Sequence, residues 1–134
     1  MEDIISIAAK SKSFGLKGRA KYSFTLKNKN CGDEINIEFD LKNNKIGNIR
    51  YDGETCIYCQ ASAALLSKNT SKLTIIKLQN LKNQIYNFFN GKINNQTLEI
   101  FDFKQLLKIE HQSRKECIAL PINAILNALK KNDY

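Results

Sequence analysis

A change in hydrophobic period near residue 55 constrains the fold of this chain more than any other feature. Before it, three segments alternate apolar and polar residues: Ala20–Leu26, Glu34–Leu41 and Ile46–Tyr51. Such alternation is typical of strands with one buried face. The Asn43-Asn44 pair between the last two segments indicates a tight turn, because asparagine tolerates positive φ. We therefore predict a three-stranded antiparallel sheet with one solvated face.

After residue 55 the apolar residues recur with a helical period. We predict helices over Cys56–Lys68, Leu73–Asn90, Phe101–Ile109 and Arg114–Lys130, and a short one over Asp3–Ala9 before a loop at Ser11–Gly18. Pro121 is expected in an early turn of the last helix, where its missing N–H is tolerated. Strands followed by helices predict an α+β fold, with the helices packed on one face of the sheet.

The length of the chain, 134 residues, favours one domain. No apolar run approaches the roughly 18 residues that a membrane-spanning helix needs. The start of the chain carries Glu2 and Asp3 without a preceding basic region, so it does not resemble a signal peptide. We therefore expect a cytoplasmic protein.

The formal charge of +8 comes from 18 lysines and only three arginines. Surfaces that recognise phosphates or bases use arginine more often, because it forms bidentate pairs. The lysines are also scattered, and lysine, asparagine and isoleucine are abundant together. The charge thus reflects a composition bias more than nucleic-acid binding, and a basic, zinc-stabilised nucleic-acid binder is kept only as a third alternative.

The four cysteines are more informative, because thiols in a reducing compartment more often bind metals or react than form disulfides. Cys31 begins the second predicted strand, and Cys56 and Cys117 lie near the starts of two predicted helices. Helix N-termini favour the thiolate, which is the metal ligand and the nucleophile.

Asp33 lies two residues from Cys31, on the same side of an extended backbone. Three thiolates and one carboxylate would complete a tetrahedral zinc site or hold iron. The alternative is that these cysteines are small buried hydrophobic residues.

The Cys56-x-x-Cys59 pair has its own alternatives. Such a spacing marks either a dithiol redox centre or half of a zinc site. Antiparallel strands precede the pair instead of a βαβ unit, and no second pair of this spacing exists in the chain. Cys59 therefore either contacts the metal site, belongs to the core or serves as an auxiliary thiol.

With these residues in view, the chain resembles the iron–sulfur cluster scaffold family of IscU, SufU and the N-terminal part of NifU. The resemblance covers about residues 20–130, and we predict an N-terminal arm over 1–19 and the scaffold domain over 20–134. The segments that carry it are Cys31-Gly32-Asp33, Ile49-Arg50-Tyr51-Asp52-Gly53-Glu54-Thr55-Cys56, the helix at Gln60-Ala61-Ser62-Ala63-Ala64-Leu65-Leu66, and Arg114-Lys115-Glu116-Cys117.

The resemblance implies that Cys31, Asp33, Cys56 and Cys117 bind a nascent, labile [2Fe–2S] or [4Fe–4S] cluster, or Zn²⁺ in its place. It implies a cysteine desulfurase as sulfur donor, with Cys117 or Cys56 as the persulfide acceptor, and downstream iron–sulfur acceptor or carrier proteins. Such a protein is a scaffold or a sulfur-transfer protein and not a conventional enzyme. We expect no nucleic-acid or membrane partner, and a monomer or transient dimer. The alternative function is a zinc-bound persulfide acceptor for a desulfurase.

Two departures from the IscU-type pattern and one match place the chain nearer the branch associated with the SUF system. Glu116 stands where IscU-type members have histidine, and the stretch upstream of Cys117 lacks the prolines of their chaperone-recognition segment. Arg114, three residues before Cys117, matches an arginine of the SUF-associated branch. His111 and Glu116 are further unproven candidates for metal ligands.

Overall fold

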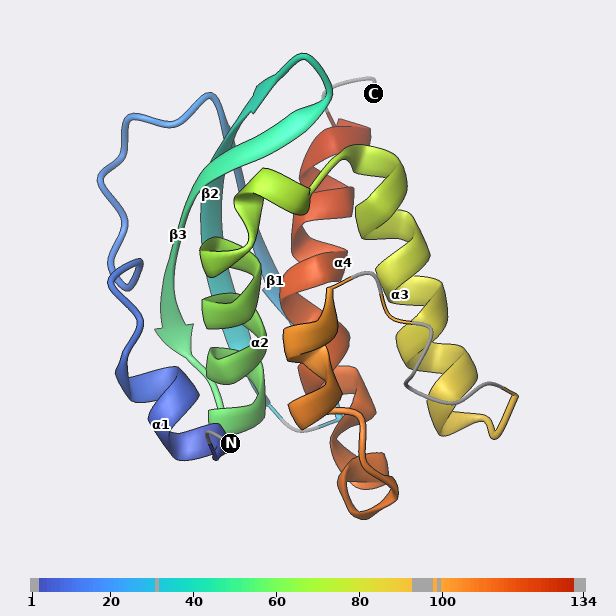
Figure 1. The fold of residues 1–134 in the computed structure, drawn as a ribbon. Helices are drawn as coiled ribbons and strands as arrows, with labels where there is room; N and C mark the ends of the chain where they lie inside the picture. The colour runs from blue at the N-terminus through green and yellow to red at the C-terminus, as the bar shows by residue number, and fades with distance from the viewer. Residues whose placement is uncertain (1–2, 31, 93–97, 99, 132–134) are drawn as a thin grey trace.

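The structure, a computed structural model, describes residues 3–30, 32–92, 98 and 100–131 (Figure 1). Cys31 lies outside the described residues. A short first helix precedes three strands, and helices follow them, which confirms the predicted α+β fold. The elements are α1 (Ile4–Ala9), β1 (Tyr22–Lys27), β2 (Glu34–Lys42), β3 (Lys45–Glu54), α2 (Ile57–Lys68), α3 (Ile75–Phe89) and α4 (Lys115–Lys131), with short 3-10 helices at Thr70–Lys72, Phe101–Gln105 and Ile109–Arg114.

The sheet is antiparallel in the order β1-β2-β3, as predicted. Ile37 pairs with Phe24 on one side and Tyr51 on the other, which aligns the apolar face across all three strands. The turn between β2 and β3 places Asn43 at φ 53° and Asn44 at φ 64°. This conformation suits a two-residue hairpin, so the predicted asparagine turn is confirmed.

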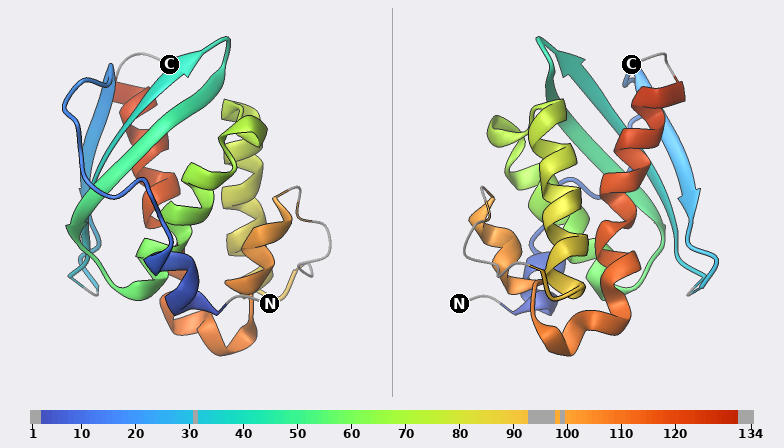
Figure 2. Two further views of the ribbon diagram at one scale, coloured as in Figure 1. Left: turned by 60° about the vertical axis from the view of Figure 1, so that its left-hand side comes forward. Right: turned by 90° about the vertical axis from the view of Figure 1, so that its right-hand side faces the viewer.

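The helices form a layer on one face of the sheet. α4 packs against β1 and β2, α2 packs against β3, and α3 packs on α4 (Figure 2). The side chains between the layers, such as Ile35, Ile37 and Phe39, are almost completely buried. Within the described residues, no helix combines the length and apolarity that crossing a membrane requires.

Small residues let α2 and α4 approach closely. Ala61, Ser62 and Ala63 in α2 are fully buried. The Ser62 hydroxyl donates a hydrogen bond of 2.6 Å to the backbone carbonyl of Ile118 in α4. This bond ties the first half of α2 to the first turns of α4, and so it fixes the two helix starts relative to each other.

Two predictions in the C-terminal half are wrong. The helix expected over Phe101–Ile109 is a 3-10 helix that already ends at Gln105, and a second 3-10 helix begins at Ile109. In the first, Leu106 N–H bonds to the Phe103 carbonyl, three residues back, and both side chains are buried. Pro121 lies inside α4 and not in its first turn. Proline has no N–H for the usual bond to the carbonyl of Cys117, and its burial in the core offsets that loss.

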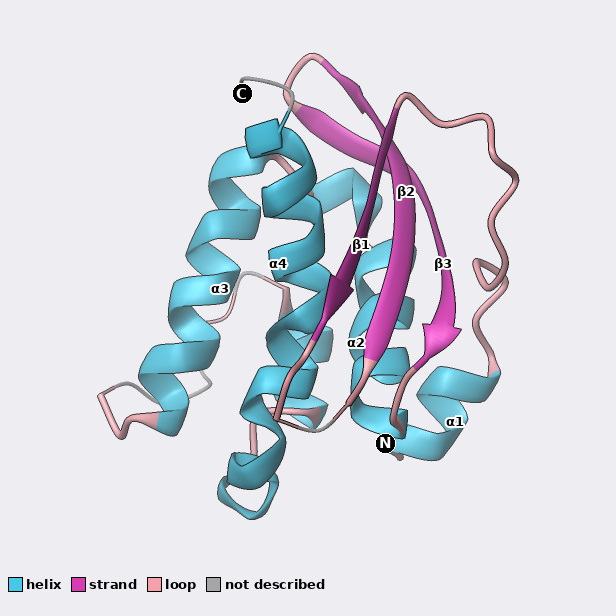
Figure 3. Ribbon diagram, turned by 180° about the vertical axis from the view of Figure 1, so that it is seen from behind, coloured by secondary structure: helices cyan, strands magenta, loops and turns pink. Residues whose placement is uncertain are grey.

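The N-terminal segment lies along the outer edge of β3 (Figure 3). The predicted short helix is confirmed as α1, which packs against α2. Gly15 N–H donates to the Tyr51 carbonyl at 2.7 Å, and the Arg50 guanidinium donates to three backbone carbonyls of residues 12, 14 and 15. The predicted division into an arm and a domain at residue 19 remains a prediction.

Candidate metal centre

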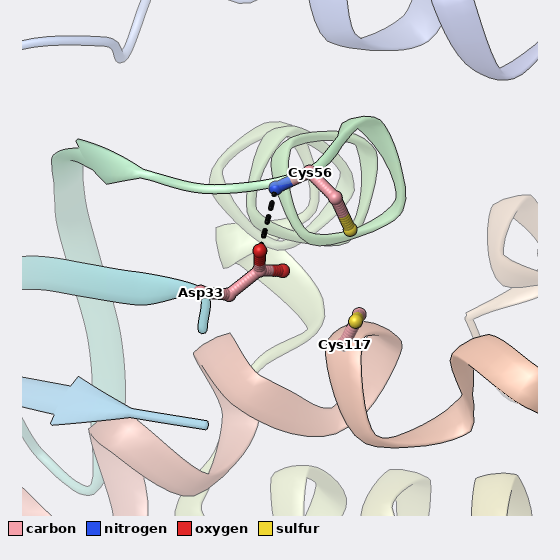
Figure 4. Close-up of side chains that lie close together, drawn as sticks. All are labelled: Asp33, Cys56 and Cys117. Atoms are coloured by element: carbon pink, nitrogen blue, oxygen red, sulfur yellow. Dashed lines mark hydrogen bonds between the residues drawn. The ribbon is translucent and has the colours of Figure 1, made fainter. Parts of the chain in front are cut away.

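Three of the four predicted ligand residues meet at the end of the sheet opposite the β2–β3 hairpin. Asp33 immediately precedes β2, Cys56 is the N-cap of α2, and Cys117 lies in the first turn of α4. One ligand atom from each residue lies within 4.8 Å of the other two. Figure 4 shows the carboxylate and both sulfur atoms facing one shared space. The fourth residue, Cys31, lies outside the described residues.

The carboxylate of Asp33 is buried and only partly satisfied. Its Oδ1 accepts a hydrogen bond of 3.1 Å from the backbone N–H of Cys56. Its Oδ2 is buried and has no hydrogen-bond partner among the residues that the structure describes. A buried carboxylate oxygen without a partner is unfavourable, and a cation beside it would offset that cost. Together with two thiols, this donor set fits zinc or iron.

Asn28, which the sequence analysis did not single out, organises the connector before Asp33. Its backbone N–H donates to the Asp33 carbonyl at 2.7 Å, and its own carbonyl accepts from Gly32 N–H at 2.8 Å. The Asn28 side-chain amide lies 4.0 Å from the sulfur of Cys117. An asparagine just after a strand, in a polar connector, is the signal that would have indicated such a turn.

Gly53 lets the end of β3 approach the start of β2. Its φ is +127°, and a Cβ at this position would collide with the backbone oxygen of Glu34. Only glycine fits such a close approach at positive φ. Because Glu34 follows Asp33 and Cys56 lies three residues after Gly53, this contact sets the spacing between the carboxylate and the N-cap of α2.

The pKa of the half-buried Cys56 thiol is raised, chiefly by burial. The backbone N–H of Cys59 and the thiol of Cys117 act to lower the pKa, while the Asp33 carboxylate raises it. Burial therefore outweighs the effect of the helix N-terminus, which was expected from the sequence to lower the thiol pKa here. A cation bound between these groups would favour the thiolate.

Arg114 lies at the exposed edge of this group. Cys117 and Cys56 raise the pKa of its guanidinium, which carries the charge that would stabilise either thiolate. The guanidinium also lies 5.8 Å from the centre of the Tyr58 ring. Arg114 thus supplies a positive charge beside both thiols without being buried itself.

The other sequence candidates are held elsewhere and do not join the group. The Nδ1 of His111 lies 2.9 Å from the Leu106 carbonyl, and its ring packs on Tyr58. Glu116 accepts a hydrogen bond of 3.0 Å from the Tyr86 hydroxyl. Cys59 is fully buried within α2.

Comparison with known proteins gives one family and one curated relative. The model of the NifU-like N-terminal domain family matches residues 4–132. The iron–sulfur cluster assembly scaffold protein IscU of Thermotoga maritima is 28% identical over 111 residues, which are 78% of this chain and 74% of that protein.

Solved structures share the fold. The N-terminal NifU-like protein of Brucella abortus superposes with a TM-score of 0.82 at 16% identity, over 95% of this chain and 89% of that one. The putative iron–sulfur cluster assembly scaffold for the SUF system of Fervidobacterium islandicum AW-1 gives 0.77 at 24% identity, over 96% and 95%. At these sequence identities, the similarity to the solved structures shows the fold alone.

Proposed function

Because the chain belongs to the NifU-like N-terminal domain family, we propose that it is a scaffold on which nascent iron–sulfur clusters are assembled and from which they pass to acceptor proteins. The observation that carries this proposal is the group of Asp33, Cys56 and Cys117, with ligand atoms within 4.8 Å of one another. The buried Oδ2 of Asp33, which has no hydrogen-bond partner in the described part of the chain, supports a cation as the occupant.

The cluster is the cargo of this protein, and its release has to be as easy as its assembly. Cys56 and Cys117 offer soft thiolates, with Cys31 as the predicted third, whereas Asp33 offers a hard oxygen. A hard oxygen is the weaker ligand for a cluster held otherwise by sulfur. We infer that Asp33 keeps one side of the cargo labile, while its hydrogen bond to Cys56 N–H holds the carboxylate in place.

A cysteine desulfurase is the proposed sulfur donor. In the transfer, the thiolate of Cys117 or Cys56 attacks the terminal sulfur of the donor persulfide, forms a new S–S bond and releases the donor thiolate. Arg114 supports this step, because its charge lies beside both thiols. The same residue matches an arginine of the branch associated with the SUF system, and so it supports that branch.

The second candidate is a zinc-bound persulfide acceptor. The buried carboxylate and two thiols favour it equally well, since Zn²⁺ takes four ligands of these kinds. Bound zinc would supply a positive charge that keeps the thiols deprotonated, and Asp33, Cys56 and Cys117 would hold it. Either way the same residues receive the sulfur.

Anaerobic reconstitution with iron, cysteine and a cysteine desulfurase separates the two functions. A scaffold gains a visible cluster absorption that the Cys31→Ser variant lacks. A protein that instead keeps stoichiometric zinc and stimulates the desulfurase, with no chromophore, is a persulfide acceptor. If neither the absorption nor the stimulation occurs, both functions are wrong.

The role of Asp33 has its own test. An Asp33→Ala protein, reconstituted in the same way, is expected to hold its cluster longer, because the hard oxygen ligand is gone. The measurement is the rate at which an apo acceptor protein takes up the cluster. Transfer at the wild-type rate would show that Asp33 does not set the lability.

A further inference from the structure

Cys56 and Cys59 occupy the N-cap and the third position of α2. Cys56 has an extended backbone, with φ −73° and ψ 168°, and its carbonyl already accepts the first helical hydrogen bond, from Gln60 N–H at 3.1 Å. Dithiol oxidoreductases form their disulfide within a Cys-x-x-Cys motif of this spacing. Residues three apart in a helical turn have Cβ atoms about 5–6 Å apart, and a disulfide needs about 3.5–4.5 Å. Closing the disulfide therefore requires a small movement at the N-cap, where the backbone of Cys56 is extended and not helical.

The two thiols differ sharply in access. Cys56 is half-buried and belongs to the group that faces Asp33 and Cys117. Cys59 is 0% exposed. A donor protein or an oxidant in solution can thus reach Cys56 but not Cys59. The buried Cys59 thiol can therefore react only with a neighbouring group, such as a persulfide carried by Cys56.

Cluster assembly from a persulfide requires a source of electrons, which the proposed function does not name. A persulfide carries its outer sulfur at the oxidation level of sulfane sulfur, whereas a cluster contains sulfide. Two electrons must be supplied to each sulfur atom before it enters a cluster. Two neighbouring thiols can supply two electrons by forming a disulfide.

We propose that Cys56 and Cys59 form a dithiol pair that reduces the sulfane sulfur held on Cys56 and releases it as sulfide beside Asp33 and Cys117. The proposal rests on the proposed function for the delivery of sulfur to this site. It gives Cys59 a role that neither the scaffold nor the zinc alternative uses.

The step balances within the pair. The sulfur of Cys59 attacks the inner sulfur of the Cys56 persulfide, a new bond joins the two cysteine sulfurs, and the bond to the outer sulfur breaks. The outer sulfur leaves with the bonding electrons and its hydrogen as hydrosulfide, and the proton of the Cys59 thiol is released with it. The outer sulfur is thereby reduced by two electrons, and the two cysteines are oxidised to a disulfide.

A dithiol reductant must then restore the pair by thiol–disulfide exchange before another turnover. The exposed side of Cys56 is where that reductant has access. A persulfide formed first on Cys117 would enter the same step after exchange to Cys56, because the two sulfurs lie within 4.8 Å. The pair therefore serves either of the two acceptor thiols.

The test uses the full-length, reduced, metal-free protein and inorganic polysulfide as the sulfane donor, so that no desulfurase is needed. Released sulfide is trapped with monobromobimane in a single turnover. Trypsin releases residues 51–68 as one peptide that contains Cys56 and Cys59 and no other cysteine. Mass spectrometry of the alkylated digest then shows whether this peptide has lost two hydrogens to a disulfide.

Loading from polysulfide itself leaves some sulfide, which is the same in every variant. The expected result in the wild-type protein is one sulfide above this background for each 51–68 disulfide formed. In Cys59→Ser, sulfide stays at the loading background and the persulfide stays on Cys56. Ala63→Ser is the matched control, because it also places a serine at a fully buried position of α2. This variant should release sulfide as the wild type does.

Sulfide release by Cys59→Ser at the wild-type rate would overturn the proposal, and so would release without the 51–68 disulfide. Circular dichroism of both serine variants checks that they fold. If Cys59→Ser does not fold, Cys59→Ala is used in its place. This assay contains no desulfurase, so its result does not depend on whether a desulfurase delivers sulfur to the protein. The dithiol proposal and the proposed scaffold function can therefore be refuted independently.

Discussion

The two ends of the sheet are completed in different ways. At the hairpin end, backbone groups satisfy one another: Ile46 N–H donates to the Leu73 carbonyl at 2.8 Å, and Ile75 N–H donates to the Asn44 carbonyl at 3.1 Å. At the other end, among the residues that the structure describes, Asp33 Oδ2 is buried without a partner. The hairpin end is therefore complete without a ligand, whereas the site end holds a buried acceptor that the described residues leave unsatisfied.

From this difference we expect stability to depend on both ends and ligand binding on the site end alone. The same strands, β2 and β3, connect both ends, so a change at one end has the other as an internal control. Changes at the hairpin end are expected to alter folding alone. Changes at the site end are expected to alter ligand binding as well.

Zinc addition gives the largest expected effect. A ligand at about 1,000 times its Kd stabilises the folded state by about 4 kcal/mol. We expect a gain of this size in urea unfolding of the reduced protein. Hydrogen exchange should slow most at the Cys56 amide, which bonds to Asp33, and least at the Ile46 amide. Equal slowing at both amides would contradict the contrast between the ends.

One substitution made at two points of β3 compares the ends directly. Gly53→Ala forces a side chain against the Glu34 backbone at φ +127°, so we expect a loss of about 3 kcal/mol in the free energy of unfolding. Gly47→Ala meets nothing within 4 Å and should be neutral or stabilise the strand by about 0.5 kcal/mol. Urea denaturation measures both. Similar losses in the two variants would show that the close approach at Gly53 does not matter.

The hairpin turn gives a smaller effect that should leave the site untouched. Asn44 has φ 64°, where alanine is disfavoured, so Asn44→Ala is expected to cost about 1 kcal/mol of stability. Asn44→Gly, which accepts this conformation, is the control and should cost less. Zinc affinity, measured by competition with a chromophoric chelator, should not change in either variant. A weaker affinity would show that the two ends are coupled.

The smallest effect is a shift in the reactivity of Cys56. Burial and Asp33 raise the pKa of its thiol, so the rate of alkylation by iodoacetamide should rise at higher pH than for a free cysteine. Asp33→Asn removes the negative charge, lowers this pKa and should move the rate profile to lower pH. Mass spectrometry of the 51–68 peptide of the metal-free protein follows the reaction. An unchanged profile would mean that burial alone sets the pKa.

Most of the fold could be predicted from the sequence, because the alternation in 20–51 and the helical stripes after residue 55 report burial directly. The family resemblance, carried by Cys31-Gly32-Asp33 and the helix after Cys56, is confirmed by the family match. The 3-10 segments after residue 100 were missed, since short apolar runs do not distinguish a helix from a tight turn.

The candidate ligand residues of the site could be predicted from the sequence, but the residues that hold them in place could not. Asp33, Cys56 and Cys117 come together as their places at element ends indicated, and their role as ligands stays a prediction. Asn28 was missed, because its part depends on bonds to residues 32 and 33 that only the folded connector forms. The raised pKa of Cys56 was also missed, since it follows from burial and not from the position at a helix start.

The segment held by Arg50 has a consequence for how copies of the chain meet. β3 is a ten-residue strand at the edge of the sheet, and a bare edge of that length pairs readily with another strand. Residues 13 and 15 occupy hydrogen-bonding groups of Tyr51 in the middle of that edge. Residues 12–15 therefore cover the middle of β3, and we expect a chain without them to self-associate through this strand.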